Sequence, residues 1–179
     1  MNKPVKILAI CGSTRKGSTN ELLLDIIADM FAGKADLVRF DGLSILPHFN
    51  PDLDNDIPPQ AVIEFRNQLR EADGVLICTP EYAMGVPGSL KNALDWVVSS
   101  MEFSGKPAAL ITASSMGEQA HQSLIRTLQV IESELPESSR LLISFVKSKV
   151  KDGRIVDEQT KREVEEVMES LLRIIVNTF

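Results

Sequence analysis

The feature that most constrains the fold is the stretch of residues 5–20, VKILAICGSTRKGSTN, in which an apolar run changes into a polar loop and then into a helical pattern. The run from Val5 to Cys11 predicts a β-strand, which Gly12 ends. A helix is expected to begin near Asn20. A strand that leads through a short loop into a helix is typical of α/β folds, in which helices cover a mostly parallel sheet.

The loop between this strand and this helix carries groups that bind anions. A helix N-terminus offers unpaired backbone N–H groups and a partial positive charge, both of which suit a phosphate. Arg15 adds a full charge and a two-pronged donor. The remaining hydroxyl and amide groups belong to Ser13, Thr14, Ser18, Thr19 and Asn20. The loop therefore predicts a phosphate site; the rival interpretation is a capped helix with Arg15 in solvent.

Two common glycine-rich loops do not fit this stretch. The spacing of Gly12 and Gly17 matches the start of the nucleoside-triphosphate motif, but Ser18 stands where that motif needs lysine. The dinucleotide motif needs glycine where this chain has Thr14. A ligand that ends in one phosphate, such as flavin mononucleotide (FMN), is the remaining candidate.

The rest of the chain continues the alternation of strands and helices. The run at 74–79, GVLICT, is apolar on both faces, as in a parallel sheet covered on each side. Because the loops after parallel strands share one edge of the sheet, the polar loops after the first, third and fourth strands should meet there. We predict a single doubly wound α/β domain over residues 1–179. Its further strands are expected at 35–40, 74–79, 108–113 and 141–146, and its helices at 20–32, 60–72, around 90–101 and 124–135, and at 157–177.

The composition of the chain disfavours several classes of binding partner. The net charge of −6 leaves no basic stripe for nucleic acid and disfavours an anionic membrane surface. The N-terminal apolar run is too short for a signal peptide and no run could span a bilayer, so a cytoplasmic location is expected. Cys11 and Cys78 fall in predicted strands, which favours thiols in the core over a disulfide.

Two features allow more than one interpretation. The segment 41–59 is rich in Pro, Asp and Asn, and it is either an ordered surface loop or the border of a site or partner. Trp96 falls off the apolar stripe of its helix, among small and polar residues. Either another segment or a second subunit must cover it, and the small neighbours favour the subunit.

Two motifs resemble those of a known family, the NAD(P)H-dependent FMN reductases, which include quinone, azo-dye and chromate reductases. GSTRKGSTN at 12–20 resembles the phosphate loop G-S-x-R-x-x-S-x-N, and PEYAMGVPGSLKNALDW at 80–96 resembles P-E-Y-N-x-x-x-P-G-x-L-K-N-A-I-D-W. The resemblance implies a flavodoxin-like fold, a five-stranded parallel sheet of order 2-1-3-4-5. It also implies FMN as cofactor and NADPH or NADH as co-substrate.

The resemblance further implies which residues bind the cofactor. Ala83 stands where the family often has Asn, so one contact must come from backbone or water, and the bulky Met84 would shape the mouth of the site. Family members are usually dimers or tetramers, with the helix that contains Trp96 in the interface. The implied residues are Ser13, Arg15, Ser18, Thr19 and Asn20 at the phosphate, Pro80, Glu81, Tyr82, Ala83 and Met84 along the isoalloxazine ring, and Ser114, Ser115 and Gly117 at its other edge.

The expected reaction passes a hydride from NAD(P)H through bound FMN to a small acceptor, such as free flavin, a quinone or an azo compound, in a ping-pong cycle. It requires no metal and no acid–base side chain, so no catalytic residue is predicted, and His121 is expected to be structural. Glu81 either positions its loop or contacts the ring, and Tyr82 packs either on the flavin or in the core. The alternative function is an FMN-binding electron carrier or redox-responsive interaction protein without nicotinamide turnover.

Overall fold

The computed structural model describes residues 4–178, which are built around a five-stranded parallel sheet of order β2-β1-β3-β4-β5. Its order and the bounds of its first four strands confirm the prediction. Strands β3 and β4 are buried along their whole length, because helices cover both faces of the sheet. The strands are β1 (Val5–Cys11), β2 (Ala35–Phe40), β3 (Gly74–Thr79), β4 (Ala108–Ala113) and β5 (Arg140–Ile143).

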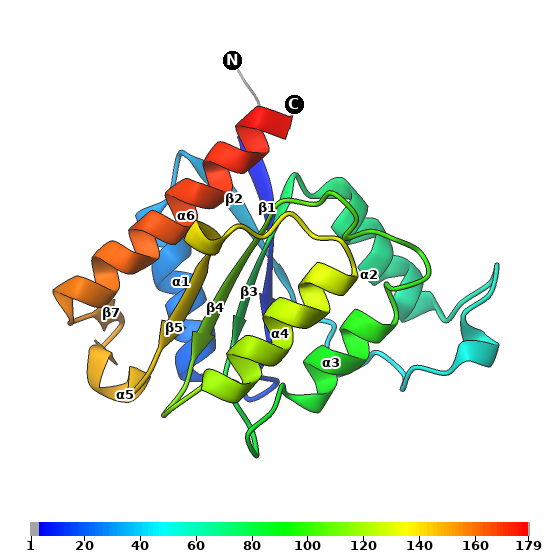
Figure 1. Cartoon of the computed structure of the whole chain (residues 1–179), viewed down its shortest axis with the longest axis horizontal. Helices are drawn as coiled ribbons and strands as arrows, with labels where there is room; N and C mark the ends of the chain where they lie inside the picture. Colours follow the sequence, from blue (N-terminus) through cyan, green and yellow to red (C-terminus); the bar gives the residue numbers. More distant parts are fainter. Residues whose placement is uncertain (1–3, 179) are drawn as a thin grey trace.

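The helices form a layer on each side of the sheet (Figure 1). One face is covered by α2 (Gln60–Glu71), α3 (Gly88–Asp95) and α4 (Glu118–Val130), and the other by α1 (Thr19–Met30) and α6 (Glu158–Thr178). All strands point toward the end of the molecule where α5 (Val146–Lys149) lies, away from the end of α6 (Figure 1). Short 3-10 helices occur at η1 (Pro51–Leu53) and η2 (Glu137–Ser139).

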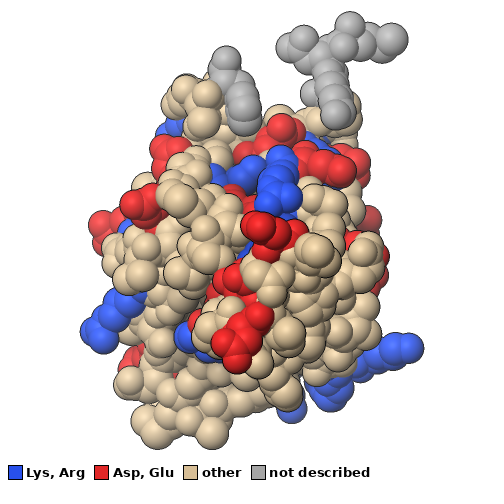
Figure 2. Space-filling model, turned by 90° about the vertical axis from the view of Figure 1, so that its right-hand side faces the viewer, with Lys and Arg blue, Asp and Glu red and all other residues tan. Residues whose placement is uncertain are grey.

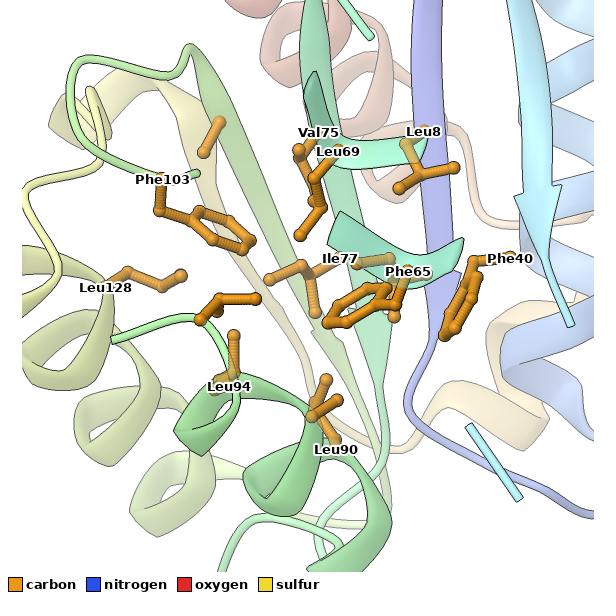
Figure 3. Close-up of a cluster of buried hydrophobic side chains, with 14 of the residues drawn as sticks. Leu8, Phe40, Phe65, Leu69, Val75, Ile77, Leu90, Leu94, Phe103 and Leu128 are labelled. Atoms are coloured by element: carbon orange, nitrogen blue, oxygen red, sulfur yellow. The ribbon is translucent and has the colours of Figure 1, made fainter. Parts of the chain in front are cut away.

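Strands β1 to β4 each contribute to two cores, because successive side chains point to opposite faces of the sheet. Leu8, Val75 and Ile77 point toward α2, α3 and α4, where they pack in the cluster that Figure 3 shows. Two aromatic rings close this cluster near β2, those of Phe40 and Phe65, with centroids 4.5 Å apart. The second cluster lies between the opposite face, α1 and α6. These two cores fix the strand ends from which the site loops start.

The fifth strand is shorter than predicted. The expected strand 141–146 ends in the structure at Ile143. Phe145 adopts a left-handed backbone conformation with φ 54°, which ends the extended structure, and α5 follows it directly. The apolar run LLISFV gave no sign of this, because hydrophobic pattern alone does not separate a short strand from the start of a short helix. After α5, the strands β6 (Val150–Lys151) and β7 (Arg154–Ile155) form an antiparallel hairpin.

Trp96 is buried within the chain itself, so the preferred covering by a second subunit is wrong. The side chain has an exposure of 0%, and its Nε1–H donates to the carbonyl oxygen of Pro47 at 2.8 Å. The ring of Phe49 lies edge-on, with the centroids 5.1 Å apart. Trp96 keeps a helical backbone just after α3 ends at Asp95, and the segment that covers it comes from 41–59, the other covering that the sequence allowed.

The segment 41–59 is an ordered strap over α2 and α3. Asn92 of α3 donates to Pro47 O at 2.9 Å, and its Oδ1 accepts the N–H of Phe49 at 2.7 Å. Further along, Asp54 forms a buried ion pair with Arg66 of α2 at 2.7 Å. Burial alone would raise the pKa of Asp54, but hydrogen bonds from Ser99 and Arg66 and the charge of Arg66 outweigh it, so its pKa lies below the usual value. The strap therefore closes the core around Trp96.

Other expectations concern the surface and the two cysteines. No helix within residues 4–178 is long and apolar enough to cross a membrane. On the face seen in Figure 2, Lys and Arg side chains are scattered among acidic ones and form no continuous basic patch. Cys11 and Cys78 are register partners on β1 and β3, and both are free thiols, as predicted. Burial raises the pKa of each thiol, which keeps them protonated at neutral pH.

Candidate cofactor site

The loops at the C-terminal ends of the strands enclose a cavity of about 680 Å³. Its walls come from four segments, which follow β1, β3, β4 and β5, whereas the strap 41–59 contributes no lining residue. Three predicted site residues, Ala83, Met84 and Gly117, do not line it, and all the others do. The lining residues are Ser13, Arg15, Ser18, Thr19, Asn20, Pro80, Glu81, Tyr82, Ala113, Ser114, Ser115, Phe145, Val146, Lys147 and Ser148.

Helix α1 begins at the wall of this cavity, with Ser18 as its N-cap. The Ser18 hydroxyl accepts the N–H of Glu21 at 3.1 Å, and the Glu21 carboxylate accepts the N–H of Gly17 at 2.5 Å. This reciprocal arrangement is close to a capping box. It leaves the first two N–H groups of the helix, those of Thr19 and Asn20, without an intrahelical partner. An anion in the cavity would therefore meet the positive end of α1.

Arg15 is the cation of the first loop. Its side chain is exposed, and within residues 4–178 its guanidinium makes no hydrogen bond or ion pair. Ser13 ties the loop together, because its hydroxyl accepts the N–H of Arg15 at 3.3 Å and lies 3.2 Å from the hydroxyl of Tyr82. Ser13 and Arg15 also line a second cavity of about 480 Å³ on the β2 side of the loop. The guanidinium is thus available to an anion in either cavity.

Asn20 links the start of α1 to the ends of two strands. Its Nδ2 donates to Ala113 O at the end of β4 at 3.0 Å, and its Oδ1 accepts from the Cys78 thiol on β3 at 3.3 Å. The residue is buried. Because an amide nitrogen carries two hydrogens, one remains for a ligand. The main effect of Asn20 is to fix the N-terminus of α1 above the sheet edge.

Glu81 holds the second loop against α4. Its carboxylate accepts the N–H of Ala120, in the first turn of α4, at 2.9 Å. Its own N–H donates to the Ser114 hydroxyl at 3.3 Å. A carboxylate at a helix N-terminus is favoured by the helix dipole as well as by the hydrogen bond. These two bonds show that Glu81 positions its loop, and a contact with the ring stays a prediction because Glu81 also lines the cavity.

The second loop ends in a tight turn between Tyr82 and Gly85, whose backbones pair reciprocally at 3.0 and 2.9 Å. Ala83 and Met84 occupy its centre with φ of 49° and 59°, the left-handed conformation of a type I′ turn. Asn tolerates this conformation better than Ala does, so an Asn at position 83 would have a backbone reason there. Tyr82 is 51% exposed and is not a core residue. Met84 is 73% exposed and lines a groove between α3 and α4 instead of the cavity.

The third loop contributes Ser114 and Ser115 to the cavity, whereas Gly117 shapes the loop. Gly117 has φ 99°, and a Cβ there would lie 2.8 Å from Leu142 Cδ1. His121, one turn into α4, is buried and its Nδ1 lies 2.9 Å from the hydroxyl of Thr112. Burial, followed by the charge of Arg140, lowers the pKa of His121 below its ordinary value. His121 does not line the cavity, and its structural role stays a prediction.

The fourth wall, residues 145–148, was not predicted, because the sequence placed 145 and 146 in a strand. Phe145 N–H donates to Ser115 O at 3.1 Å, and Val146 N–H donates to Ser114 O at 3.0 Å. These bonds attach α5 to the third loop. One signal could have revealed it: a polar, basic segment that follows the fifth parallel strand also reaches the ligand edge of the sheet.

The groups around the cavity fit FMN. The groups that could bind a phosphate there are the N-terminus of α1, the hydroxyls of Ser18 and Thr19 and the guanidinium of Arg15. A flat aromatic ring could lie against Pro80 and Tyr82 of the second loop and against the polar backbone of the third loop. The cavity volume lies within the range of about 300–1,000 Å³ that is usual for small-ligand sites.

The comparison with known proteins agrees with this arrangement. A family model described as NADPH-dependent FMN reductase matches residues 5–144. The chain belongs to this family. It is 33% identical over 177 residues to the NAD(P)H-dependent FMN reductase of Pseudomonas aeruginosa, covering 96% of this chain and 95% of that protein. It is also 33% identical over 174 residues to a 2-hydroxy-1,4-benzoquinone reductase of a Burkholderia species, covering 92% and 93%.

A solved structure extends the agreement to the fold. The flavoenzyme NAD(P)H:(acceptor) oxidoreductase of Paracoccus denitrificans superimposes with a TM-score of 0.84 at 26% identity, covering 97% of this chain and 98% of that one. The fold is therefore flavodoxin-like. The protein is an NAD(P)H-dependent oxidoreductase with FMN as its cofactor, and the enzyme interpretation is confirmed over the electron carrier.

Proposed function

We propose that this FMN reductase passes a hydride from NADPH or NADH through bound FMN to a small acceptor, such as a quinone, free flavin or an azo compound, in two separate half-reactions. When bound, FMN supplies the hydride-accepting and hydride-donating chemistry. The observation that carries the proposal is the convergence of the loops after β1, β3 and β4 on one cavity. The Burkholderia relative, named for a benzoquinone, supports quinones as acceptors. A cytoplasmic location is part of the same proposal.

Different residues of the cavity would bind the phosphate and the ring of FMN. Ser13, Arg15, Ser18, Thr19 and Asn20 would hold the phosphate, as the free N–H groups at the start of α1 support. The ring would lie against the second and third loops, whose backbone N–H groups can stabilise negative charge on it. No side chain is needed to transfer a proton, because solvent can protonate a reduced acceptor. The lining residues on these two loops are Pro80, Glu81, Tyr82, Ser114 and Ser115.

An anaerobic titration tests the proposed reaction. The FMN-loaded protein, freed of unbound flavin, should lose the visible absorption of the flavin when NADPH or NADH is added. It should regain that absorption when benzoquinone follows, because the acceptor reoxidises the cofactor. Free FMN at the same concentration serves as the control and should keep its colour over the same time. Protein-bound flavin that stays oxidised with both nucleotides would contradict the proposal.

We also propose a homodimer or homotetramer that uses the outer face of α3 and α4, in place of the region around Trp96. Figure 1 shows these helices side by side, and a groove of about 630 Å³ lies along them. Exposed apolar patches rimmed by polar groups mark interfaces. The side chains of Met84, Val98 and Val130 are 73%, 53% and 76% exposed there. The rim carries charges of both signs, which a second copy of the same face could pair: Lys91, Asp95 and Arg126.

The molar mass in solution tests this interface. Light scattering during gel filtration should give two or four times the chain mass of 19.7 kDa for the wild type. Val130→Glu should shift the protein to the monomer, because it buries a charge in the interface. Val176→Glu, on the distant helix α6 and 68% exposed, is the matched control and should leave the mass unchanged. A wild-type monomer at micromolar concentration would exclude the interface.

A further inference from the structure

Lys147 is a second cation in the wall of the main cavity, and it comes from the segment that no motif predicted. Within residues 4–178 its ammonium group makes no ion pair or hydrogen bond. Among the residues that line the cavity, Glu81 carries the one carboxylate, and an oxygen of that carboxylate already accepts the N–H of Ala120. With Arg15 and Lys147 together, the cavity carries an excess of positive charge. Such a cavity selects an anion.

The backbone that carries Lys147 is held firmly in place. On one side, Phe145 and Val146 donate their N–H groups to the third loop at 3.1 and 3.0 Å. Val146 is also buried in the core beneath α1 and α6. On the other side, the hairpin after α5 returns to donate the N–H of Val156 to Lys149 O at 2.8 Å. A Phe in the left-handed conformation persists only where its surroundings impose it, which indicates that this turn is fixed at the cavity.

A chain of direct contacts links α5 to the start of α1. Asn20, in the first turn of α1, donates to Ala113 O. The next residue along, Ser114, accepts the N–H of Val146 through its carbonyl oxygen. Lys147 follows Val146 directly and shares the cavity wall with Thr19. Lys147 and the N-terminus of α1 therefore face the same cavity.

We infer that Lys147 binds the phosphate of FMN from the α5 side, as a second cation beside Arg15. The inference rests on the proposed FMN site. A phosphate monoester carries about 1.5 to 2 negative charges at pH 7, more than one guanidinium neutralises. The chain offers a matched control in Lys149, which lies in the same short helix but does not line the cavity.

Binding of two flavins to the flavin-free, full-length protein tests this inference. FMN and riboflavin differ in the phosphate, and flavin fluorescence reports the binding of either one. Lys147→Ala should raise the Kd for FMN about tenfold, because it removes one charge-assisted contact, and should leave the Kd for riboflavin unchanged. Lys147→Arg should retain most of the FMN affinity. Lys149→Ala should change neither Kd.

Other outcomes would overturn the inference in distinguishable ways. If Lys147→Ala weakens the binding of FMN and riboflavin equally, Lys147 contacts a part that both flavins share. If neither Kd changes, Lys147 does not contact the flavin. An unchanged FMN affinity with a raised KM for NADPH would assign Lys147 to a phosphate of the dinucleotide. If the wild type does not prefer FMN to riboflavin, the proposed phosphate site itself fails, whatever Lys147 does. Circular dichroism of each variant confirms that it is folded.

Discussion

Replacing Trp96 with Ala is expected to lower the free energy of unfolding by about 3–5 kcal/mol, because truncating a buried Trp leaves a cavity that the surrounding structure only partly fills. Trp96 is among the largest fully buried side chains of the described residues. The substitution also removes the hydrogen bond to Pro47 and the edge-on contact with Phe49, so the strap over α3 loses two of its contacts. The free energy of unfolding of a domain is typically about 5–15 kcal/mol, so the expected loss is a large share of the total stability.

Urea unfolding followed by far-ultraviolet circular dichroism measures this loss. Tryptophan fluorescence cannot serve, because Trp96 is the one Trp of the chain. Trp96→Phe should cost less than Trp96→Ala, since it keeps most of the apolar volume and loses the hydrogen bond. Ile45→Ala, in the same strap but 67% exposed, is the matched control and should change stability by less than about 0.5 kcal/mol. A loss below about 1 kcal/mol for Trp96→Ala would contradict the burial of Trp96 under the strap.

The parts of the fold that depend on local sequence could be predicted. Strands β3 and β4 are continuous apolar runs between glycine or proline and a polar loop, and their observed bounds equal the predicted ones. The first helix was also located closely, because α1 begins at Thr19, one residue before the predicted start, with Ser18 as its N-cap. Because parallel strands place their following loops at one edge, three separate loops could be assigned to one site before any contact was known.

The parts that depend on contacts between distant segments could not be predicted in this way. The burial of Trp96 requires knowing that Pro47 and Phe49 pack on it, and nothing in their own neighbourhood of the sequence indicates this. The wall at 145–148 depends on backbone bonds from α5 to Ser114 and Ser115, which replace the strand that the apolar run favoured. The hydrogen bond between Glu81 and the N–H of Ala120 likewise depends on the packing of α4 against the second loop.

Arg15→Ala is expected to weaken the binding of FMN by about 1.5–3 kcal/mol, which is a tenfold or larger rise in Kd. This range is the usual free-energy contribution of a hydrogen bond that involves a charged group, here the guanidinium and the phosphate. The guanidinium of Arg15 lines the cavity beside the N-terminus of α1 and has no other partner within residues 4–178. Riboflavin should bind the variant as well as the wild type, because it offers no phosphate to Arg15. The FMN affinity of Arg15→Lys should lie between those of the wild type and Arg15→Ala, since lysine keeps the charge but not the two-pronged donor of the guanidinium.

The neighbouring residue supplies the control, because Lys16 lines the second cavity and not the main one. Lys16→Ala removes the same charge one residue away and should leave the FMN affinity nearly unchanged. If Arg15→Ala and Lys16→Ala behave alike, the effect comes from the general field of the loop and not from a direct contact. If Arg15→Ala has no effect while Lys147→Ala weakens FMN, the phosphate is neutralised from α5 and Arg15 serves the second cavity. The two cations thus test each other's assignment in one assay.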